Sequence, residues 1–401
     1  MTSIQQDRYP VYDQLRSNTP VLAEPSATSL RTYTTWHLTR YDDCLTALRD
    51  PRFVHEERKY LAPEVCEEPG ENISSLTSSQ RNWMLFKDPP DHTRLRSLVQ
   101  RAFTPKIVQN LQPRMEHITT MLLDEMEAQT EVDLVQAYAF PLPVMIIATL
   151  LGVPMQDREQ FRAWSNILFQ SLDFLVSDTT WEQASQAVDA LRAYLRDIVH
   201  ERVKQPQDDL ISGMVRARDE HGKLSEDELL DNCILMLAAG HETTVNLIAN
   251  GVYLLLREPE ALVQLQRDWT LLPSAVEEIL RYESPIQVTT RFVSEDVQLG
   301  DVTLKKGDYV SPWLGAANRD PAKFTEPDRF DITRDPNRHL AFGQGIHFCL
   351  GAPLARLEGQ VAIKAYFQRF PKSTFVGDQA WAFKPSVLTR SLAHLKLKVA
   401  P

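Results

Sequence analysis

One long helical pattern, from Ser225 to Arg257, constrains the fold of this 401-residue chain more than any other feature. Ser225 and Glu228 match the capping box that opens helices, and Glu258-Pro259 ends the pattern. At about 1.5 Å per residue, such a helix is roughly 50 Å long and can cross a whole domain. No linker rich in Ser, Gly or Pro divides the chain, so we expect one large domain.

Helical periodicity dominates elsewhere too. The spacing of apolar residues predicts a helix from Thr104 to Met126, with Thr104 as its cap. It predicts another over Val144 to Leu151, with Gly152 and Pro154 as its stop. Strand signals are fewer: one over Tyr33 to Leu38, and a hairpin over Val297 to Val310 that turns around Gly300-Asp301. The fold class predicted from the sequence is therefore mainly α with small β-sheets.

Charge and composition exclude several classes of function. The net charge of −11, without a long Lys/Arg run, argues against nucleic acid as a partner. The first residues have no apolar stretch for a signal peptide, and about 18 consecutive apolar residues, as a membrane-spanning helix needs, occur nowhere. Cys44, Cys66, Cys233 and Cys349 are widely spaced, which indicates a reducing compartment without disulfides or a zinc ribbon. We expect a cytoplasmic protein with no nucleic-acid or membrane partner.

Glycine is scarce in the chain, with 14 residues, but gathers around Cys349. A helical pattern follows from Leu350 to Phe370, so the cysteine lies in a glycine-rich turn just before a helix N-terminus. The helix dipole and free backbone N–H groups stabilise a thiolate there, and glycine lets the backbone approach the sulfur closely. The glycines are Gly343, Gly345, Gly351 and Gly359.

Three other interpretations of this turn exist. A buried structural cysteine does not explain the glycines. A dinucleotide-binding GxGxxG motif would need glycine where Phe348 stands. A zinc site of His347 and Cys349 lacks further ligands at standard spacing. Local physics alone leaves a functional thiolate and a structural cysteine about equally supported.

The segment from Phe342 to Gly351, Phe-Gly-Gln-Gly-Ile-His-Phe-Cys-Leu-Gly, resembles the haem-binding signature of the cytochrome P-450 family without a departure. The resemblance implies a cytochrome P-450 fold in which a single domain, residues 1–401 with no fused reductase, surrounds a buried haem b (iron protoporphyrin IX). It also implies that Cys349 is the axial metal ligand, whose thiolate favours O–O cleavage.

A second motif, Ala239-Gly240-His241-Glu242-Thr243-Thr244, lies in the middle of the long helix. Glycine there costs roughly 1 kcal/mol relative to alanine, and small residues leave room for a plate-like cofactor. Read alone, the stretch is a packed helix in which Thr243 bonds back to a preceding carbonyl. It resembles the family's oxygen-activating motif, which implies that Thr243 holds dioxygen and a proton-donating water while Glu242 relays protons. His241 falls at a variable position and receives no role.

Glu278 and Arg281 form an i, i+3 pair that periodicity places opposite the apolar stripe, as a solvated surface pair would be. This pair resembles the family's ExxR clamp, which implies that it is buried and supports the cysteine loop, with Arg329 as the third member. Cationic partners for the haem propionates follow from the same resemblance. They are His92, Arg96, Arg291 and His347.

The implied reaction is a monooxygenation: one oxygen atom of O2 enters a lipophilic small molecule by hydroxylation or epoxidation, with secondary metabolism as one setting. No flavin or iron–sulfur segment is present, so electrons from NAD(P)H are expected through a ferredoxin or flavodoxin. A peroxide-driven peroxygenase and a non-catalytic haem sensor are the alternatives, and the Glu242-Thr243 pair argues against both. Candidate docking residues, with ordinary surface charge as the alternative, are Arg94, Arg101, Arg338 and Arg356.

The substrate's identity does not follow from the sequence. By resemblance, the substrate pocket is bordered by mostly apolar segments, as a lipophilic guest requires. These are the loop from Phe53 to Lys87, Leu168 to Leu172, Leu235, Ala238, Val288, Thr289 and Leu388.

Overall fold

The computed structural model describes residues 7–28, 31–65, 74–154, 157–173, 176–221, 224–377 and 381–400. Cys66 and part of the predicted substrate loop from Phe53 to Lys87 lie outside these ranges. Helices dominate and the sheets are small, so the predicted fold class is confirmed. The chain forms two compact units, each assembled from separate stretches: residues 1–72, 270–349 and 383–391 in the first, and residues 73–269, 350–382 and 392–401 in the second.

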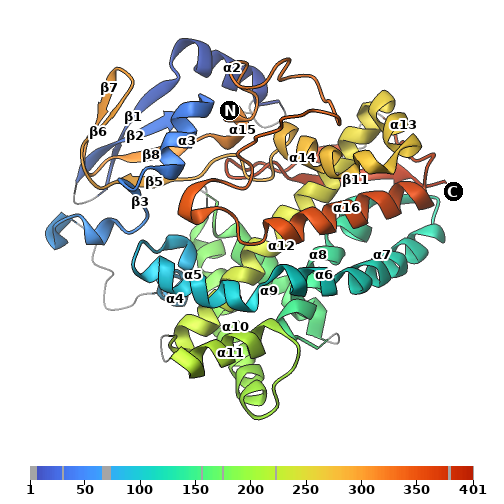
Figure 1. The fold of residues 1–401 in the computed structure, drawn as a ribbon, viewed down its shortest axis with the longest axis horizontal. Helices are drawn as coiled ribbons and strands as arrows, with labels where there is room; N and C mark the ends of the chain where they lie inside the picture. Colours follow the sequence, from blue (N-terminus) through green and yellow to red (C-terminus); the bar gives the residue numbers. More distant parts are fainter. Residues whose placement is uncertain are drawn as a thin grey trace. The chain divides into compact units, whose positions relative to one another are not determined.

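The first unit contains a five-stranded sheet in the order β1-β2-β8-β5-β3 (Figure 1). β2 pairs antiparallel with β1 and parallel with β8, where Trp36 lies opposite Val310. The remaining elements are helices and a hairpin. The bounds are α2 (Tyr9–Asn18), β1 (Val21–Ala27), β2 (Thr32–Leu38), α3 (Tyr41–Arg49), β3 (Phe53–Val54), η1 (Glu57–Lys59), η2 (Pro63–Val65), α14 (Leu272–Tyr282), β5 (Arg291–Val293), β6 (Val297–Leu299), β7 (Val302–Leu304), β8 (Tyr309–Pro312), α15 (Leu314–Ala317) and η7 (Gly345–His347).

The strands predicted in this unit are present. β2 covers the predicted strand, and β6 and β7 form the predicted hairpin around Gly300. The end of the predicted hairpin, Val310, instead belongs to β8 in the larger sheet. Leu38 and Val310 lie in an apolar cluster with residues of α3, and this cluster is the core on which the sheet packs.

The second unit is a set of packed helices with short strands at its margin. Their bounds are α4 (Ser75–Gln80), η3 (Met84–Phe86), α5 (Asp91–Ala102), α6 (Pro105–Asn110), α7 (Gln112–Glu127), β4 (Glu131–Asp133), η4 (Val135–Ala139), α8 (Pro141–Leu151), α9 (Arg158–Gln170), α10 (Asp178–Lys204), α11 (Leu210–His221), α12 (Glu226–Arg257), α13 (Pro259–Arg267), α16 (Ala352–Arg369), β9 (Thr374–Phe375) and β11 (Leu392–Lys398). Two further elements, η6 (Trp269–Leu271) and β10 (Trp381–Phe383), lie where the chain passes from one unit to the other.

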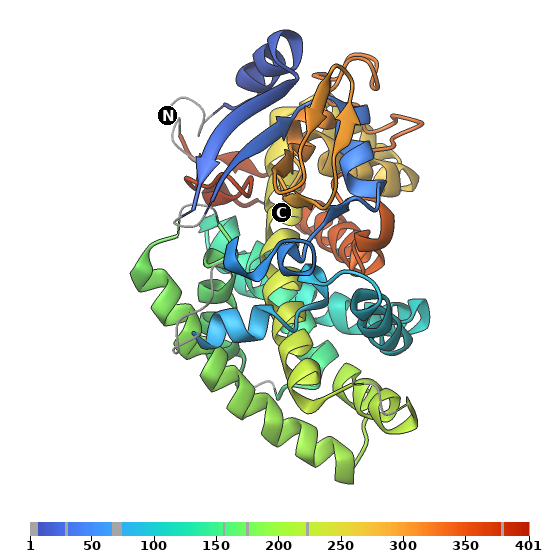
Figure 2. The same cartoon turned by 90° about the vertical axis from the view of Figure 1, so that its left-hand side faces the viewer.

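The long helix predicted from Ser225 onward is α12, the yellow helix in Figure 2. Its capping box is complete: the Ser225 hydroxyl accepts from the Glu228 N–H at 3.1 Å, and the Glu228 carboxylate accepts from the Ser225 N–H at 2.9 Å. Residues from Leu229 to Ala238 and from Thr244 to Leu255 are buried, so α12 is the central helix of this unit.

The other predicted helices are present with different bounds. The pattern from Thr104 to Met126 forms two helices, α6 and α7, which meet at Leu111. Thr104 caps α6 as predicted, by accepting from the Ile107 N–H. α8 ends at Gly152, whose φ of 76° is the left-handed conformation that the predicted stop required.

No helix in the described part of the chain is long and apolar enough to cross a membrane. The cytoplasmic location stays a prediction.

A buried acid lies in α16. Glu358 is 2% exposed, and burial raises the pKa of its carboxyl well above the usual value of 4.5. The folded protein therefore keeps this proton at pH values where the unfolded chain has lost it. Above the unfolded pKa, the contribution of this group to stability falls as the pH rises.

We predict that Glu358→Gln, which cannot ionise, gains stability relative to the parent as pH rises from about 5 to about 8. Thermal unfolding at several pH values measures this difference. Glu125→Gln, at an exposed position of α7, is the control, because it removes a carboxyl group that is not buried. A Glu358→Gln difference that stays constant with pH would contradict a protonated Glu358.

Candidate active site

The cysteine loop, the segment of the first unit from Phe342 to Cys349, is a tight turn held by backbone hydrogen bonds. The Cys349 N–H donates to the Phe342 carbonyl at 2.9 Å, and the Gly343 N–H donates to the Leu340 carbonyl at 2.8 Å. Cys349 is half-buried, and α16 begins three residues later, at Ala352. The predicted glycine-rich turn before a helix is thus confirmed.

Gly345 is the glycine that this turn needs most. Its φ is +73°, and a Cβ atom added there would lie 2.4 Å from the Leu48 carbonyl oxygen. Both the backbone conformation and the close approach to α3 exclude a side chain. The loop is thereby fixed against α3 within the first unit.

The Glu278–Arg281 pair is buried. The family resemblance implied this burial, whereas helical periodicity predicted a solvated surface pair. Both side chains are 0% exposed, and the Arg281 Nε lies 2.7 Å from the Glu278 Oε2. The remaining Arg281 donors bind the carbonyl oxygens of Asn318, Pro327 and Arg329. The guanidinium therefore holds together three points of the chain that precede the cysteine loop.

The third member of this clamp is Arg334, and the prediction of Arg329 is wrong. The Arg334 Nε lies 3.2 Å from the Glu278 Oε2, and its side chain is 11% exposed. The Arg329 side chain is 64% exposed and pairs with Glu326; only its carbonyl oxygen takes part, accepting from Arg281 and Arg334. The backbone of Arg329, not its charge, belongs to the clamp.

A chain of hydrogen bonds connects the clamp to the cysteine loop. Arg281 donates to the Asn318 carbonyl at 2.9 Å, and the Asn318 side-chain oxygen accepts from the Leu340 N–H at 2.6 Å. The Leu340 carbonyl in turn accepts from Gly343 at 2.8 Å. The clamp therefore positions the start of the turn that carries Cys349.

The oxygen-activating motif lies in α12 of the second unit. Ala239 is exposed and Gly240 and Thr243 are partly exposed, although nearly every other residue of this helix is buried. The Thr243 hydroxyl donates to the Ala239 carbonyl at 2.9 Å, as predicted, and Glu242 is 3% exposed. One turn of α12 thus presents an accessible face of small residues with a hydroxyl at its edge and an acid beside it.

His241, which received no role from the sequence, has a definite structural one. It is fully buried; its Nδ1 lies 2.8 Å from the Ser165 hydroxyl of α9, and its ring meets Phe140 edge-on at 4.5 Å. Ser165 also donates to the Leu237 carbonyl. The pair ties α9 to α12 directly beside the motif, and nothing in the local sequence indicated this partner.

The predicted propionate-binding residues divide between the units. His92 and Arg96 lie one turn apart on α5, and burial, with Arg96 as a smaller cause, lowers the pKa of His92 to about 4. In the first unit, the Arg291 guanidinium donates to the Thr290 carbonyl at 2.7 Å, and His347 lies edge-on to His55.

The residues present fit a haem. Cys349 supplies a half-buried thiol on a turn that glycine keeps open, and α12 supplies an accessible small-residue face in the middle of its buried stretch. The first unit carries Cys349, His347 and Arg291, and the second carries Glu242, Thr243, His92 and Arg96. The role of each residue stays a prediction.

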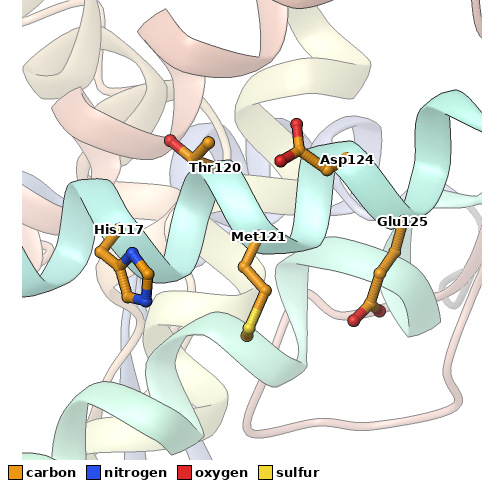
Figure 3. Close-up of a pocket in the computed structure, with 5 residues that line it drawn as sticks. All are labelled: His117, Thr120, Met121, Asp124 and Glu125. Carbon is orange, nitrogen blue, oxygen red and sulfur yellow. The ribbon is translucent and has the colours of Figure 1, made fainter.

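A shallow hollow of about 480 Å³ lies elsewhere in the second unit. All its lining residues belong to α7: Figure 3 shows His117, Met121 and Glu125 on one side of the helix and Thr120 and Asp124 on the other. The Asp124 carboxylate is paired with Arg369 of α16 at 2.7 Å. Within the described residues, no group of three or more His, Cys, Asp or Glu could hold a metal ion here or elsewhere. This hollow carries none of the predicted site residues.

Comparison with known proteins decides the family. The family model for cytochrome P450 matches residues 48–396. The chain belongs to the cytochrome P450 family. This P450 is 42% identical to the biotin biosynthesis cytochrome P450 of Bacillus subtilis (strain 168), over 96% of this chain and 95% of that one. It is 41% identical to the 6-deoxyerythronolide B hydroxylase of Saccharopolyspora erythraea, over 98% and 96%.

Solved structures agree. The crystal structure of P450BioI in complex with an acyl carrier protein ligated to hexadec-9Z-enoic acid has a TM-score of 0.89 and 40% identity, covering 98% of each chain. The P450 PksS of the Bacillus subtilis 168 bacillaene polyketide synthase also has a TM-score of 0.89, at 37% identity, covering 100% of this chain and 98% of that one. The protein is thus a P450 monooxygenase, a haem-thiolate enzyme that uses O2.

The clamp gives a test with a matched control. We predict that Arg334→Ala lowers the free energy of unfolding by about 1.5–3 kcal/mol, the range for hydrogen bonds to a charged group, because Glu278 loses a cationic partner. Arg329→Ala should change it by less than about 0.5 kcal/mol, since that side chain is exposed. Denaturant unfolding and haem content per chain measure both variants. Equal losses in the two would restore Arg329 as a clamp member.

Proposed function

We propose that this P450 hydroxylates or epoxidises a lipophilic small molecule of secondary metabolism, with Cys349 holding the iron and the Glu242-Thr243 pair managing protons. The observation that carries the proposal is the accessible face of Ala239, Gly240 and Thr243 within the stretch of α12 from Leu229 to Leu255, which is otherwise buried. A packed structural helix has no use for such a face. A non-catalytic haem sensor has no need for the acid and the hydroxyl beside it.

Haem, when bound, supplies the activation of O2 and the transfer of one oxygen atom to the substrate. The Thr243 hydroxyl, anchored on the Ala239 carbonyl at 2.9 Å, keeps an oxygen atom at the accessible face that can hold a water molecule. Glu242, at the preceding position and 3% exposed, would pass protons along α12 from the protein side. In this proposal, Thr243 holds the proton-donating water and Glu242 supplies the protons.

The names of relatives support the substrate class. A vitamin D(3) 25-hydroxylase and a 6-deoxyerythronolide B hydroxylase are each 41% identical to this chain. A solved relative, at 34% identity and a TM-score of 0.84, binds testosterone. We infer a bulky, largely apolar substrate of the polyketide, steroid or fatty-acyl type.

Electrons reach this P450, in our proposal, from NAD(P)H through a separate ferredoxin or flavodoxin in the cytoplasm. Among the residues predicted to dock it, Arg101 and Arg338 are exposed, as a docking contact requires. Arg94 is bound within the second unit to Glu228 of α12 at 2.6 Å. Although burial acts the other way, this pair holds the pKa of Glu228 below its usual value. We therefore remove Arg94 from the docking set and assign it to the packing of α5 on α12.

The thiolate ligand has a spectroscopic test. The reduced protein with carbon monoxide should show the strongly red-shifted absorption band of a thiolate-ligated haem, and Cys349→Ala should abolish it. Cys44→Ala is the control: that thiol is fully buried in the first unit, burial raises its pKa, and the band should persist. A band that survives in Cys349→Ala would remove Cys349 from its role.

The proton pathway has its own test. We predict that Thr243→Ala keeps the thiolate spectrum but lowers product formed per NADPH by about 10²-fold, the lower end of the range for losing an acid/base contribution, with more hydrogen peroxide released. Thr244→Ala is the matched control, because the Thr244 hydroxyl donates to the Gly240 carbonyl, the same type of contact as that of Thr243 but one residue further along α12. Product and peroxide per NADPH are measured for both variants. Unchanged coupling in Thr243→Ala would mean that protons arrive by another route.

A further inference from the structure

A single buried carboxylate, Asp231 of α12, holds two other elements of the second unit. It is 0% exposed. Its oxygens accept from the Arg192 Nε at 2.8 Å and Nη2 at 2.6 Å, a two-pronged contact with α10. They also accept from the Ser79 hydroxyl at 2.7 Å and the Asn82 side-chain amide at 2.8 Å.

The next residue of α12 fixes the same segment a second time. The Asn232 side-chain oxygen accepts from the Met84 N–H at 3.0 Å, and its amide donates to the Asn82 carbonyl at 2.9 Å. Trp83, which is 0% exposed, donates to the Ser79 hydroxyl at 3.1 Å. The segment from Ser74 to Phe86, here called the α4 strap, is thus bound to α12 through specific side chains as well as apolar contact.

Arg192 of α10 and the α4 strap both donate hydrogen bonds to the same acceptor, the Asp231 carboxylate. A carboxylate that accepts several charge-assisted hydrogen bonds is held in one orientation by all of them together. Loss of the carboxylate therefore loosens α10 and the α4 strap at the same time. Loss of the Ser79 hydroxyl, in contrast, loosens the strap and leaves the contact with α10 in place.

The position of Asp231 on α12 relates this network to the substrate. Leu235 and Ala238 follow at i+4 and i+7, so they continue the same face of the helix toward the accessible residue Ala239. Both were predicted to border the substrate, as was part of the α4 strap.

We propose that Asp231 is a positioning residue that sets where the α4 strap and α10 lie on α12, and thereby which bulky ligands this P450 binds. The inference rests on the proposed function in one respect, that the substrate lies along this part of α12. Asp231 itself touches neither substrate nor cofactor; it acts through the strap.

The chain offers a matched control for the removal of the Asp231 carboxylate. Arg196 and Glu226 form a second ion pair between α10 and α12, at 3.0 Å, with side chains 42% and 39% exposed. This pair joins the same two helices but makes no contact with the α4 strap that the structure records. Glu226→Gln therefore removes a charge between α10 and α12 without touching the network of Asp231.

The experiment compares Asp231→Asn, Glu226→Gln and the parent as haem-loaded proteins with two azoles that bind haem iron, imidazole and the bulky clotrimazole. Asp231→Asn should weaken clotrimazole about tenfold, measured by spectral titration, and leave imidazole unchanged. Hydrogen exchange should become faster in the α4 strap and in α10 together. Glu226→Gln should change neither azole's affinity.

Two results would overturn the proposal. One is faster exchange in Asp231→Asn with unchanged clotrimazole affinity, which would indicate a purely structural role. The other is equal weakening of the binding of both azoles. If Asp231→Asn does not fold, Ser79→Ala replaces it, with clotrimazole weakened about threefold and exchange faster in the strap alone. Failure of the proposed function appears differently, as a parent protein without a thiolate band in carbon monoxide. The exchange measurement tests the network in that case too.

Discussion

The ion pair between Glu278 and Arg281 is the interaction on which the cysteine-bearing unit depends. Two fully buried charges lose their hydration, and their mutual attraction alone does not repay the loss. The pair is compatible with folding because backbone groups complete its hydrogen bonds, among them the Asn318 and Pro327 carbonyls. The pair fixes the position of the irregular chain between α15 and the cysteine turn. This stretch has few regular hydrogen bonds of its own, and the side chains of the clamp supply hydrogen bonds in their place.

Much of the fold follows from local signals. The capping box at Ser225, the stop at Gly152 and the hairpin at Gly300 each have a physical signature within a few residues, and each lies where the sequence predicts it. The cysteine turn belongs to the same group, because its glycines are required by the backbone itself. Such features are readable since the atoms that create them are neighbours in the chain.

Other features depend on partners that the sequence does not reveal. The ExxR pair looks solvent-exposed by periodicity, and only the family resemblance indicated its burial. Even that resemblance named Arg329 as the third member, because a pattern of residue types does not show whether a side chain or a carbonyl makes the contact. The contacts of His241 with Ser165 and of Asp231 with Ser79 join residues far apart in sequence, and neither end carries a local mark.

The way the first unit is assembled has a consequence for synthesis. Trp36 of β2 pairs with Val310 of β8, about 270 residues further along the chain. At ribosomal rates of about 5–20 residues per second, the strand waits roughly ten seconds to a minute for its partner. During that time one edge of the β1–β2 ribbon offers unpaired backbone groups. Nascent chains of this protein therefore pass through a long stage in which an N-terminal hairpin needs protection, and slower translation prolongs that stage without changing the final fold.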